Sequence, residues 1–159
     1  IDEVGAAAAR NVIRQTLEGD GAALTSFFGH SGPTTWSFSG LFSATDAADL
    51  TNFDQPTVVT QWGCWNTSFV SPSFNTMAHR FMVSGEQGAA AVLGAATLTT
   101  VQSDRDFGIR LVPAMTAPGV RIGDALMDAK NALRGNPAAY RDVIIGFNLL
   151  GDPAMVIRK

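Results

Sequence analysis

The chain has 159 residues, of which 46% are hydrophobic and 16% charged, with a formal net charge of −3. This length and apolar content suit one folded domain and exclude intrinsic disorder, which requires few apolar residues and a high net charge. The sequence has no basic run for a phosphate backbone and no unbroken apolar stretch long enough for a membrane span, so it predicts neither partner. A single cysteine excludes an internal disulfide and a cysteine-rich zinc site. Because the sequence begins at Ile1 rather than at methionine, we expect that a segment precedes it.

The first half of the sequence predicts two helices, two strands and irregular connections. Apolar side chains recur near helical spacing up to Glu18, and Gly19-Asp20-Gly21 then ends the helix. Thr57–Trp62 is rich in β-branched residues, which favours a strand. The predicted elements are a helix over Ile1–Glu18, a buried strand over Ala22–Phe28, a helical turn over Asp46–Thr51, a strand over Thr57–Trp62, a loop over Asn66–Ser73 and a helix over Asn75–Val83.

The second half predicts further helices around one central strand. The run from Gly88 to Ala96 is apolar and made of small residues, as in a strand covered on both faces. Val143–Leu150 is apolar and compatible with a helix or a strand. The predicted elements are a strand over Gly88–Ala96, a helix over Asp106–Met115 broken at Pro113, an amphipathic helix over Ile122–Leu133 and a short final strand over Ala154–Ile157.

Strands that alternate with helices predict an α/β fold, with a mostly parallel sheet covered by helices on both faces. In such sheets ligands bind beyond the carboxyl ends of the strands. Two glycine-containing segments occupy such positions, Gly29-His30-Ser31-Gly32 after the first strand and Gly63-Cys64-Trp65 after the second. The candidate functional residues are therefore His30 and Cys64.

Cys64 and His30 form a candidate nucleophile and base. A cysteine thiolate is a strong nucleophile, and a neighbouring imidazole both activates it and protonates the leaving group. If the two strands are neighbours, both side chains overhang the same edge of the sheet. The other histidine, His79, falls inside a predicted helix, so we expect no catalytic role for it. A buried structural cysteine and a histidine that bonds to the backbone of a turn remain the alternatives.

A serine nucleophile is a second alternative. Gly29-His30-Ser31-Gly32-Pro33 is close to the G-x-S-x-G turn of α/β-hydrolases, in which Ser31 would attack the substrate. The match fails at its last position, where Pro33 stands in place of glycine. Such a triad also needs an acid and then a histidine further along the chain, and His79 is the only one left.

Several segments together resemble the gingipain-type cysteine peptidases. They are Ala23-Leu-Thr-Ser-Phe-Phe-Gly-His-Ser-Gly, Leu50-Thr-Asn, Pro56-Thr-Val-Val-Thr-Gln-Trp-Gly-Cys-Trp-Asn, Gly88-Ala-Ala-Ala-Val-Leu-Gly and Leu149-Leu-Gly-Asp-Pro-Ala. The resemblance covers nearly the whole chain, in the order of the family. It implies a caspase-like three-layer α/β/α sandwich, with His30 and Cys64 as a catalytic dyad on adjacent strands. It also implies an oxyanion held by the backbone amides of Cys64 and of Ser31, although the family usually has glycine where Ser31 stands.

The resemblance further implies that residues 1–159 form the C-terminal half of a peptidase domain. Two strands and their helices normally precede this segment. The Ala22–Phe28 strand would then have one unpaired edge, available to the missing half or to a second copy of the chain. In some relatives the missing part also supplies a carboxylate that orients the histidine.

The expected activity is that of a cysteine endopeptidase acting on a polypeptide, with a catalytically inactive binding or secretion-associated module as the alternative. We expect this activity of the full-length protein and expect residues 1–159 alone to be inactive. Trp36 and Trp65 fall in loops near the expected site, where they are candidates to line a substrate groove. We expect no cofactor, although the resemblance allows for calcium. It also implies an exported bacterial protein, extracellular or at the cell surface.

Overall fold

A computed structural model describes residues 5–70 and 73–157 and shows a four-stranded sheet at the centre of the molecule. Its strands are β1 (Leu24–Phe28), β5 (Thr57–Trp62), β6 (Ala89–Ala95) and β7 (Phe147–Gly151), and they lie in the order β1-β5-β6-β7. β1 pairs parallel with β5 and β5 parallel with β6, whereas β7 runs antiparallel to β6. The sheet is mostly parallel, as the sequence predicts.

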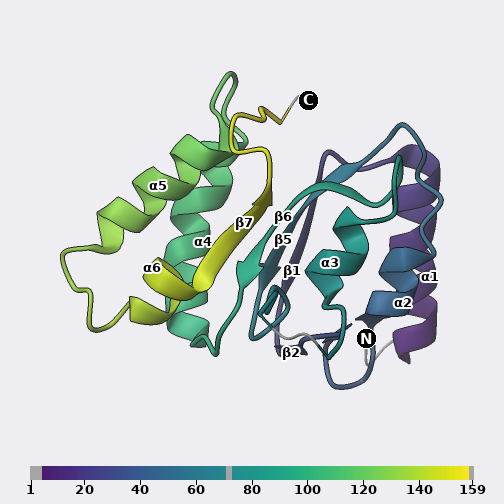
Figure 1. Cartoon of the computed structure of the whole chain (residues 1–159), viewed down its shortest axis with the longest axis horizontal. Coiled ribbons are helices and arrows are strands. Elements are labelled where there is room, and N and C mark those ends of the chain that lie inside the picture. Colours follow the sequence, from purple (N-terminus) through teal and green to yellow (C-terminus); the bar gives the residue numbers. More distant parts are fainter. Residues whose placement is uncertain (1–4, 71–72, 158–159) are drawn as a thin grey trace.

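Helices cover both faces of this sheet (Figure 1). One layer contains α1 (Gly5–Gln15) with its π-helical extension η1 (Thr16–Asp20), α2 (Ala44–Ala48) and α3 (Met77–Met82). The other contains α4 (Val101–Met115), α5 (Ile122–Leu133) and α6 (Arg141–Gly146). Of the described helices, none is long and apolar enough to cross a membrane.

Two apolar clusters, one on each face of the sheet, form the core. On the α4–α6 side, Trp62 stacks on Phe147, and Phe107 meets both rings edge-on. On the α1–α3 side, Trp36 packs with Phe42 and Phe81. All six residues of β5 are buried because this strand lies inside the sheet with a helical layer on either side.

A small antiparallel sheet follows β1 in a region that the sequence predicts to be irregular. Its strands, in spatial order, are β2 (Ser31–Gly32), β3 (Thr35–Trp36) and β4 (Phe42–Ser43). β4 leads into α2, where Ser43 and Asp46 form a reciprocal capping box. The two-residue strands carry no detectable period of their own, which explains why the pattern missed them.

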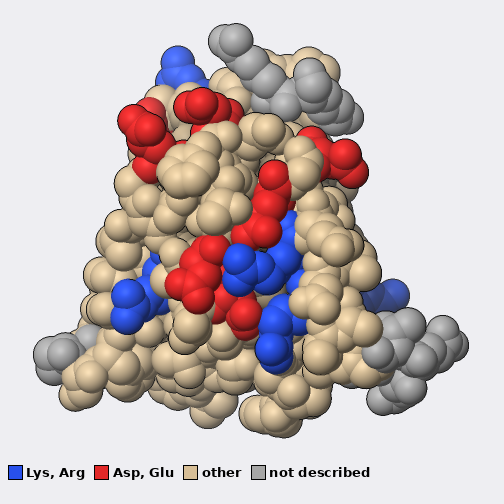
Figure 2. Space-filling view, turned by 90° about the vertical axis from the view of Figure 1, so that its right-hand side faces the viewer, with Lys and Arg blue, Asp and Glu red and all other residues tan. Residues whose placement is uncertain are grey.

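Charged side chains gather over the outer surface of α1 and α2 (Figure 2). There Arg10 lies 3.4 Å from Asp46, and Arg14 lies 2.8 Å from Glu18. Arg14 also donates a hydrogen bond to the Asp49 carbonyl oxygen, which ties α1 to the end of α2. On this face, positive and negative groups are interspersed rather than separated.

Most predicted elements are present, and the differences have local causes. β5 and α5 have the predicted bounds. The helix predicted from Asp106 begins five residues earlier, because the Thr100 side chain caps it by accepting a hydrogen bond from the Ser103 amide, and it continues through Pro113. The ambiguous segment from Val143 divides into the end of α6 and most of β7.

Two predictions about strands are wrong. No residue of β1 is fully buried, because the strand lies at the edge of the sheet rather than inside it. The strand predicted over Ala154–Ile157 is absent, and this segment makes only an isolated bridge between Val156 and Arg121. Residues 1–4 of the predicted first helix lie outside the described residues.

Candidate active site

His30 and Cys64 follow the carboxyl ends of neighbouring parallel strands. In the β1–β5 ladder, Phe28 is paired with Trp62, so the two strands end at the same level. The Gly29 amide donates to the Trp62 carbonyl oxygen at 3.0 Å, which extends the pairing by one residue. Each candidate residue stands two positions beyond the end of its strand. The parallel register therefore carries both to the same edge of the sheet.

One cavity of about 580 Å³ is lined by both His30 and Cys64. The His30 side chain is exposed, and its ring stacks on Phe38 with 5.4 Å between the ring centroids. Cys64 is half-buried, and Trp65 beside it is 37% exposed. Further lining residues are Phe28, Trp62, Leu98, Thr99, Val101 and Asp104. The arrangement puts a thiol and an imidazole in one apolar, solvent-open hollow.

Ser31 ties the two strand ends together with its side chain. Its hydroxyl donates to the Cys64 carbonyl oxygen at 2.9 Å and accepts from the Asn66 side-chain amide at 3.1 Å. Ser31 is only 5% exposed. Because the hydroxyl is buried and its proton is engaged, the geometry disfavours Ser31 as a nucleophile.

Gly63 allows the two strand ends to approach each other closely. A Cβ at this position would collide with the Gly29 carbonyl oxygen and would lie 2.5 Å from the Ser31 hydroxyl oxygen. The backbone carbonyl cannot rotate away as a flexible side chain could. The Gly-Cys sequence thus sets how near the Cys64 loop comes to the His30 loop.

The prediction that Trp36 lines the groove is wrong. Trp36 is 2% exposed and belongs to the core on the α1–α3 side, where its ring stacks on Phe27. Its indole N–H donates to the Gln61 side-chain oxygen at 2.7 Å. The short β2–β3 hairpin turns this side chain inward, away from the cavity. Trp65, in contrast, lines the cavity, and its backbone has a positive φ of 64°.

His79 does not line the cavity that contains His30 and Cys64. It is exposed on α3 and lines a different cavity, together with Phe74, Met82 and Leu150. This second cavity shares no lining residue with the first. The expectation that His79 has no catalytic role therefore agrees with its position.

Asp104 is a residue of the cavity that the sequence analysis missed. It is 4% exposed, and one carboxylate oxygen accepts a hydrogen bond from the Thr99 hydroxyl at 2.7 Å, while the other has no hydrogen-bond partner. Burial raises the pKa of Asp104 to about 6, the Thr99 hydrogen bond opposes this rise, and the nearby charge of Asp142 adds to it.

A signal for Asp104 exists in the sequence. Asp104, Phe107, Leu111 and Met115 follow one another at helical spacing, so the acidic residue extends the buried stripe of α4. The predicted start at Asp106 left it outside the helix.

No group of three or more His, Cys, Asp and Glu side chains that could hold a metal ion occurs in the part of the chain that the structure describes.

A mostly parallel sheet between two helical layers, with a cysteine and a histidine beyond adjacent strands, is a caspase-like α/β/α sandwich. The model of Peptidase family C25 matches residues 2–158. The chain belongs to this family, so the predicted gingipain type is confirmed.

Solved structures support the same assignment of the fold. The Arg-specific cysteine proteinase gingipain R matches with a TM-score of 0.76 and 18% identity, over 94% of this chain and 36% of its own. A complex of the pro- and mature domains of Porphyromonas gingivalis RgpB matches with a TM-score of 0.75 and 19% identity, over 94% and 37%. A further protease matches with a TM-score of 0.72 and 14% identity, over 90% and 37%. The chain thus spans little more than a third of these proteins. No curated protein matches it.

Gly63→Ala should destabilise the protein by about 1–3 kcal/mol, because the added methyl group has no space against the Gly29 carbonyl. Urea denaturation of the purified chain measures this loss. Gly32→Ala is the matched control, since a Cβ there meets no atom within 4 Å. Equal stability of the two variants would show that the strand ends are not held as closely as described.

Asp104→Asn should change how stability depends on pH. Because the folded pKa of about 6 exceeds the ordinary value of 3.8, the folded wild type binds more protons between these values and loses stability as pH rises through them. Asparagine keeps an acceptor for Thr99 and cannot ionise. Between pH 4 and pH 7 the free energy of unfolding of the variant should therefore rise, relative to that of wild type, by on the order of 1–2 kcal/mol. Urea denaturation at both pH values tests this, and a constant difference would contradict it.

Proposed function

We propose that this chain carries the catalytic dyad of a cysteine endopeptidase, with Cys64 as the nucleophile and His30 as the acid and base. The observation that supports this most is that both residues follow the ends of adjacent parallel strands and line one cavity. Membership of Peptidase family C25 supports the same chemistry. The proposed substrate is a polypeptide, which the cavity would receive from its open side.

The proposed reaction has two stages. The Cys64 sulfur attacks the carbonyl carbon of the scissile peptide bond, and the C–N bond breaks as the His30 imidazolium gives its proton to the leaving amine. A thioester then joins the acyl group to Cys64. Water attacks this thioester, His30 accepts a proton from the water, and the carboxylic product leaves as the thiolate is regenerated. Both stages use groups of the chain and water alone, so the proposal includes no cofactor.

The backbone amides of Ser31 and Cys64 are the proposed donors to the oxyanion. The His30 carbonyl accepts from the Ser37 amide, so the adjacent Ser31–Trp36 pair is of the non-hydrogen-bonded kind. In such a pair the amide points away from the partner strand, which leaves the Ser31 N–H uncommitted to β3. Two preorganised amide donors contribute several kcal/mol to a transition state of this type, on the order of 2.7–4 each by mutagenesis.

Apolar side chains at the mouth are proposed to contact the substrate. Trp65, Phe28, Phe38 and Leu98 line the cavity, and all four are exposed. They would cover the side chains on either side of the scissile bond. Ser31 as a nucleophile is not proposed, because its buried hydroxyl is committed to the Cys64 carbonyl.

The cellular setting is proposed from the family alone. A gingipain-type peptidase is expected to be exported by a bacterium and to act outside the cell or at its surface. The remainder of the domain is expected to complete the groove next to His30.

Cys64→Ala should abolish hydrolysis of a peptide substrate by the full-length protein, and His30→Ala should lower kcat by two to four orders of magnitude, about the contribution of a general acid and base. His79→Ala is the matched control, since His79 lines a different cavity and should leave kcat unchanged. Hydrolysis that persists in Cys64→Ala would refute the assignment. Stable binding of the peptide with no hydrolysis by wild type would favour the inactive binding module instead.

The outer edge of β1 is the proposed docking site for another strand. The Gly29 amide and the Ala23 carbonyl bond to β5, so the alternating groups of Leu24, Ser26 and Phe28 point outward. Among the described residues β1 pairs with β5 alone. Phe28 is 53% exposed, and the strand has no lysine or proline to protect it. Such an edge recruits another chain.

Residues 1–159 alone should therefore associate at micromolar concentration through β1, and the Phe28→Lys variant should weaken this association because a charge on an edge strand opposes pairing. Analytical ultracentrifugation measures both. Ile109→Lys is the control, because it places the same charge at an exposed apolar position on α4. A wild-type chain that sediments as a monomer, or equal effects of the two variants, would contradict pairing through this edge.

A further inference from the structure

Thr99 links Cys64 to the buried Asp104. The Thr99 backbone N–H donates to the Cys64 sulfur at 3.4 Å, and the Cys64 thiol donates to the Thr99 carbonyl oxygen at 3.7 Å. The Thr99 hydroxyl donates to the Asp104 carboxylate at 2.7 Å. The same hydroxyl oxygen lies 3.9 Å from the Cys64 sulfur. Thr99 thus contacts the sulfur with its backbone and its hydroxyl, and it contacts the carboxylate with the hydroxyl alone.

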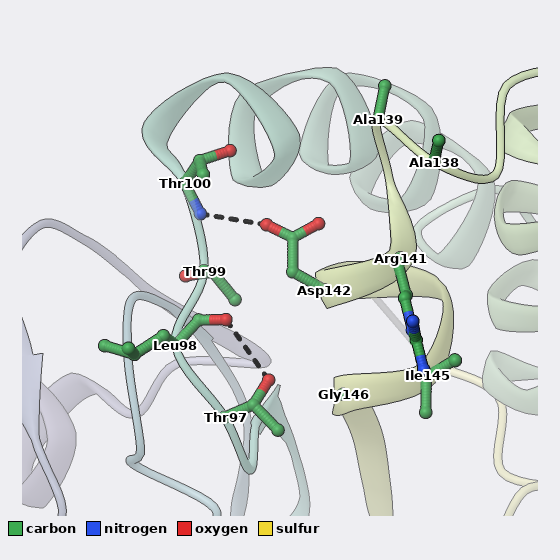
Figure 3. Close-up of a pocket in the computed structure, with 10 residues that line it drawn as sticks. All are labelled: Thr97, Leu98, Thr99, Thr100, Ala138, Ala139, Arg141, Asp142, Ile145 and Gly146. Atoms are coloured by element: carbon green, nitrogen blue, oxygen red, sulfur yellow. Dashed lines mark hydrogen bonds between the residues drawn. The ribbon is translucent and has the colours of Figure 1, made fainter.

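The segment that carries Thr99 is held from both sides. The Thr100 amide donates to the Asp142 carboxylate at 2.9 Å, and Asp142 belongs to α6 (Figure 3). On the side of the catalytic cavity, the Trp65 amide donates to the Thr97 carbonyl oxygen at 3.1 Å. These contacts fix the course of the backbone. The Asp104 carboxylate anchors the side chain of Thr99 between them.

We propose that Asp104 is a positioning residue for Cys64, which it serves by holding Thr99 so that the Thr99 amide points at the sulfur. This inference rests on the proposed role of Cys64 as the nucleophile. A hydrogen bond from a fixed amide stabilises a thiolate more than a thiol, because it is stronger toward a charged acceptor. Asp104 acts through Thr99 and does not contact the reacting carbon.

Asp104 has two opposing effects on the stability of a Cys64 thiolate, one through its hydrogen bond to Thr99 and one through its own charge. An ionised Asp104 disfavours a second negative charge on Cys64, whereas its hydrogen bond to Thr99 favours that charge. The other titratable or charged groups around the segment are His30 in the same cavity, and Arg141 and Asp142 on α6. Variants must therefore separate the hydrogen bond from the charge.

Thr99→Val and Asp104→Asn make this separation. Valine is close to threonine in shape and keeps the backbone amide, but it lacks the hydroxyl that bonds to Asp104 and lies 3.9 Å from the sulfur. Asp104→Leu removes the acceptor and leaves this hydroxyl in place, so the midpoint of its pH profile should lie above that of Asp104→Asn, which lacks the same charge. Asparagine keeps an oxygen that accepts from Thr99, but it removes the charge. Thr99→Ser restores the hydroxyl and is the conservative variant. Thr97→Val is the matched control, because the Thr97 hydroxyl donates only to the neighbouring Leu98 carbonyl oxygen.

The experiment measures the rate at which iodoacetamide alkylates Cys64 in residues 1–159, at pH values from 5 to 10. Circular dichroism verifies that each variant is folded. Thr99→Val should move the midpoint of the pH profile upward by about half a unit, which slows alkylation at pH 7 about threefold. Thr99→Ser and Thr97→Val should follow wild type. Asp104→Asn should leave the midpoint in place or move it downward.

The proposal is overturned if the Thr99→Val profile coincides with that of wild type, or if Thr97→Val shifts the midpoint equally. An upward shift in Asp104→Asn would also overturn it, because the retained acceptor should preserve the position of Thr99. Alkylation requires no peptidase activity. A failure of the proposed function, seen as hydrolysis that survives in Cys64→Ala, is therefore distinguishable from a failure of this inference.

Discussion

The parallel ladder between β1 and β5 is the constraint on which the candidate site depends. Residue-by-residue pairing from Leu24–Val58 to Phe28–Trp62 makes the two strands end at one level, and the Gly29–Trp62 hydrogen bond carries the alignment past the strands. A shift of one residue would move either His30 or Cys64 along the sheet by about 3.3 Å and would point its neighbours to the opposite face. The register is held by burial, because β5 presents Trp62 to one core and Gln61, through Trp36, to the other.

The loops that follow β1 and β5 are also held together by contacts between their own residues. Gly63 permits the two loops to approach each other closely. The Ser31 hydroxyl donates to the Cys64 carbonyl oxygen and accepts from the Asn66 side-chain amide. These contacts order the backbone around Cys64 without using its sulfur. The sulfur is contacted from the opposite side by Thr99, in the segment after β6. Cys64, the proposed nucleophile, is therefore held through its carbonyl oxygen by Ser31 and through its sulfur by Thr99, an arrangement that would leave little reorganisation for the proposed reaction.

The sequence predicts those features that depend on neighbouring residues along the chain. β-branched residues over Thr57–Trp62 and the apolar period over Ile122–Leu133 define elements with correct bounds, and the strand-end positions of His30 and Cys64 follow from them. Features that depend on tertiary contacts were missed. Trp36 is turned inward by a hairpin of two-residue strands, and Asp104 is buried because a cap at Thr100 starts α4 early. The two-residue strands have no periodic signal, whereas the early start of α4 has one in the helical spacing of Asp104 with Phe107 and Leu111, which the predicted start at Asp106 left out.

The position of β1 affects both the candidate site and the edge of the sheet. It is at once the strand that leads to His30 and the edge strand of the sheet, so the histidine side of the cavity has a neighbour only on the β5 side among the described residues. His30 is exposed and, within residues 5–70 and 73–157, its ring stacks on Phe38 and meets no carboxylate, whereas Cys64 is half-buried and contacted by Thr99. The two residues of the proposed dyad thus differ in how firmly other residues hold them. A strand added to β1 would border His30 directly and leave the contacts of Cys64 unchanged. Pairing of a further strand with β1 should therefore affect the proposed acid and base, His30, more than the proposed nucleophile, Cys64.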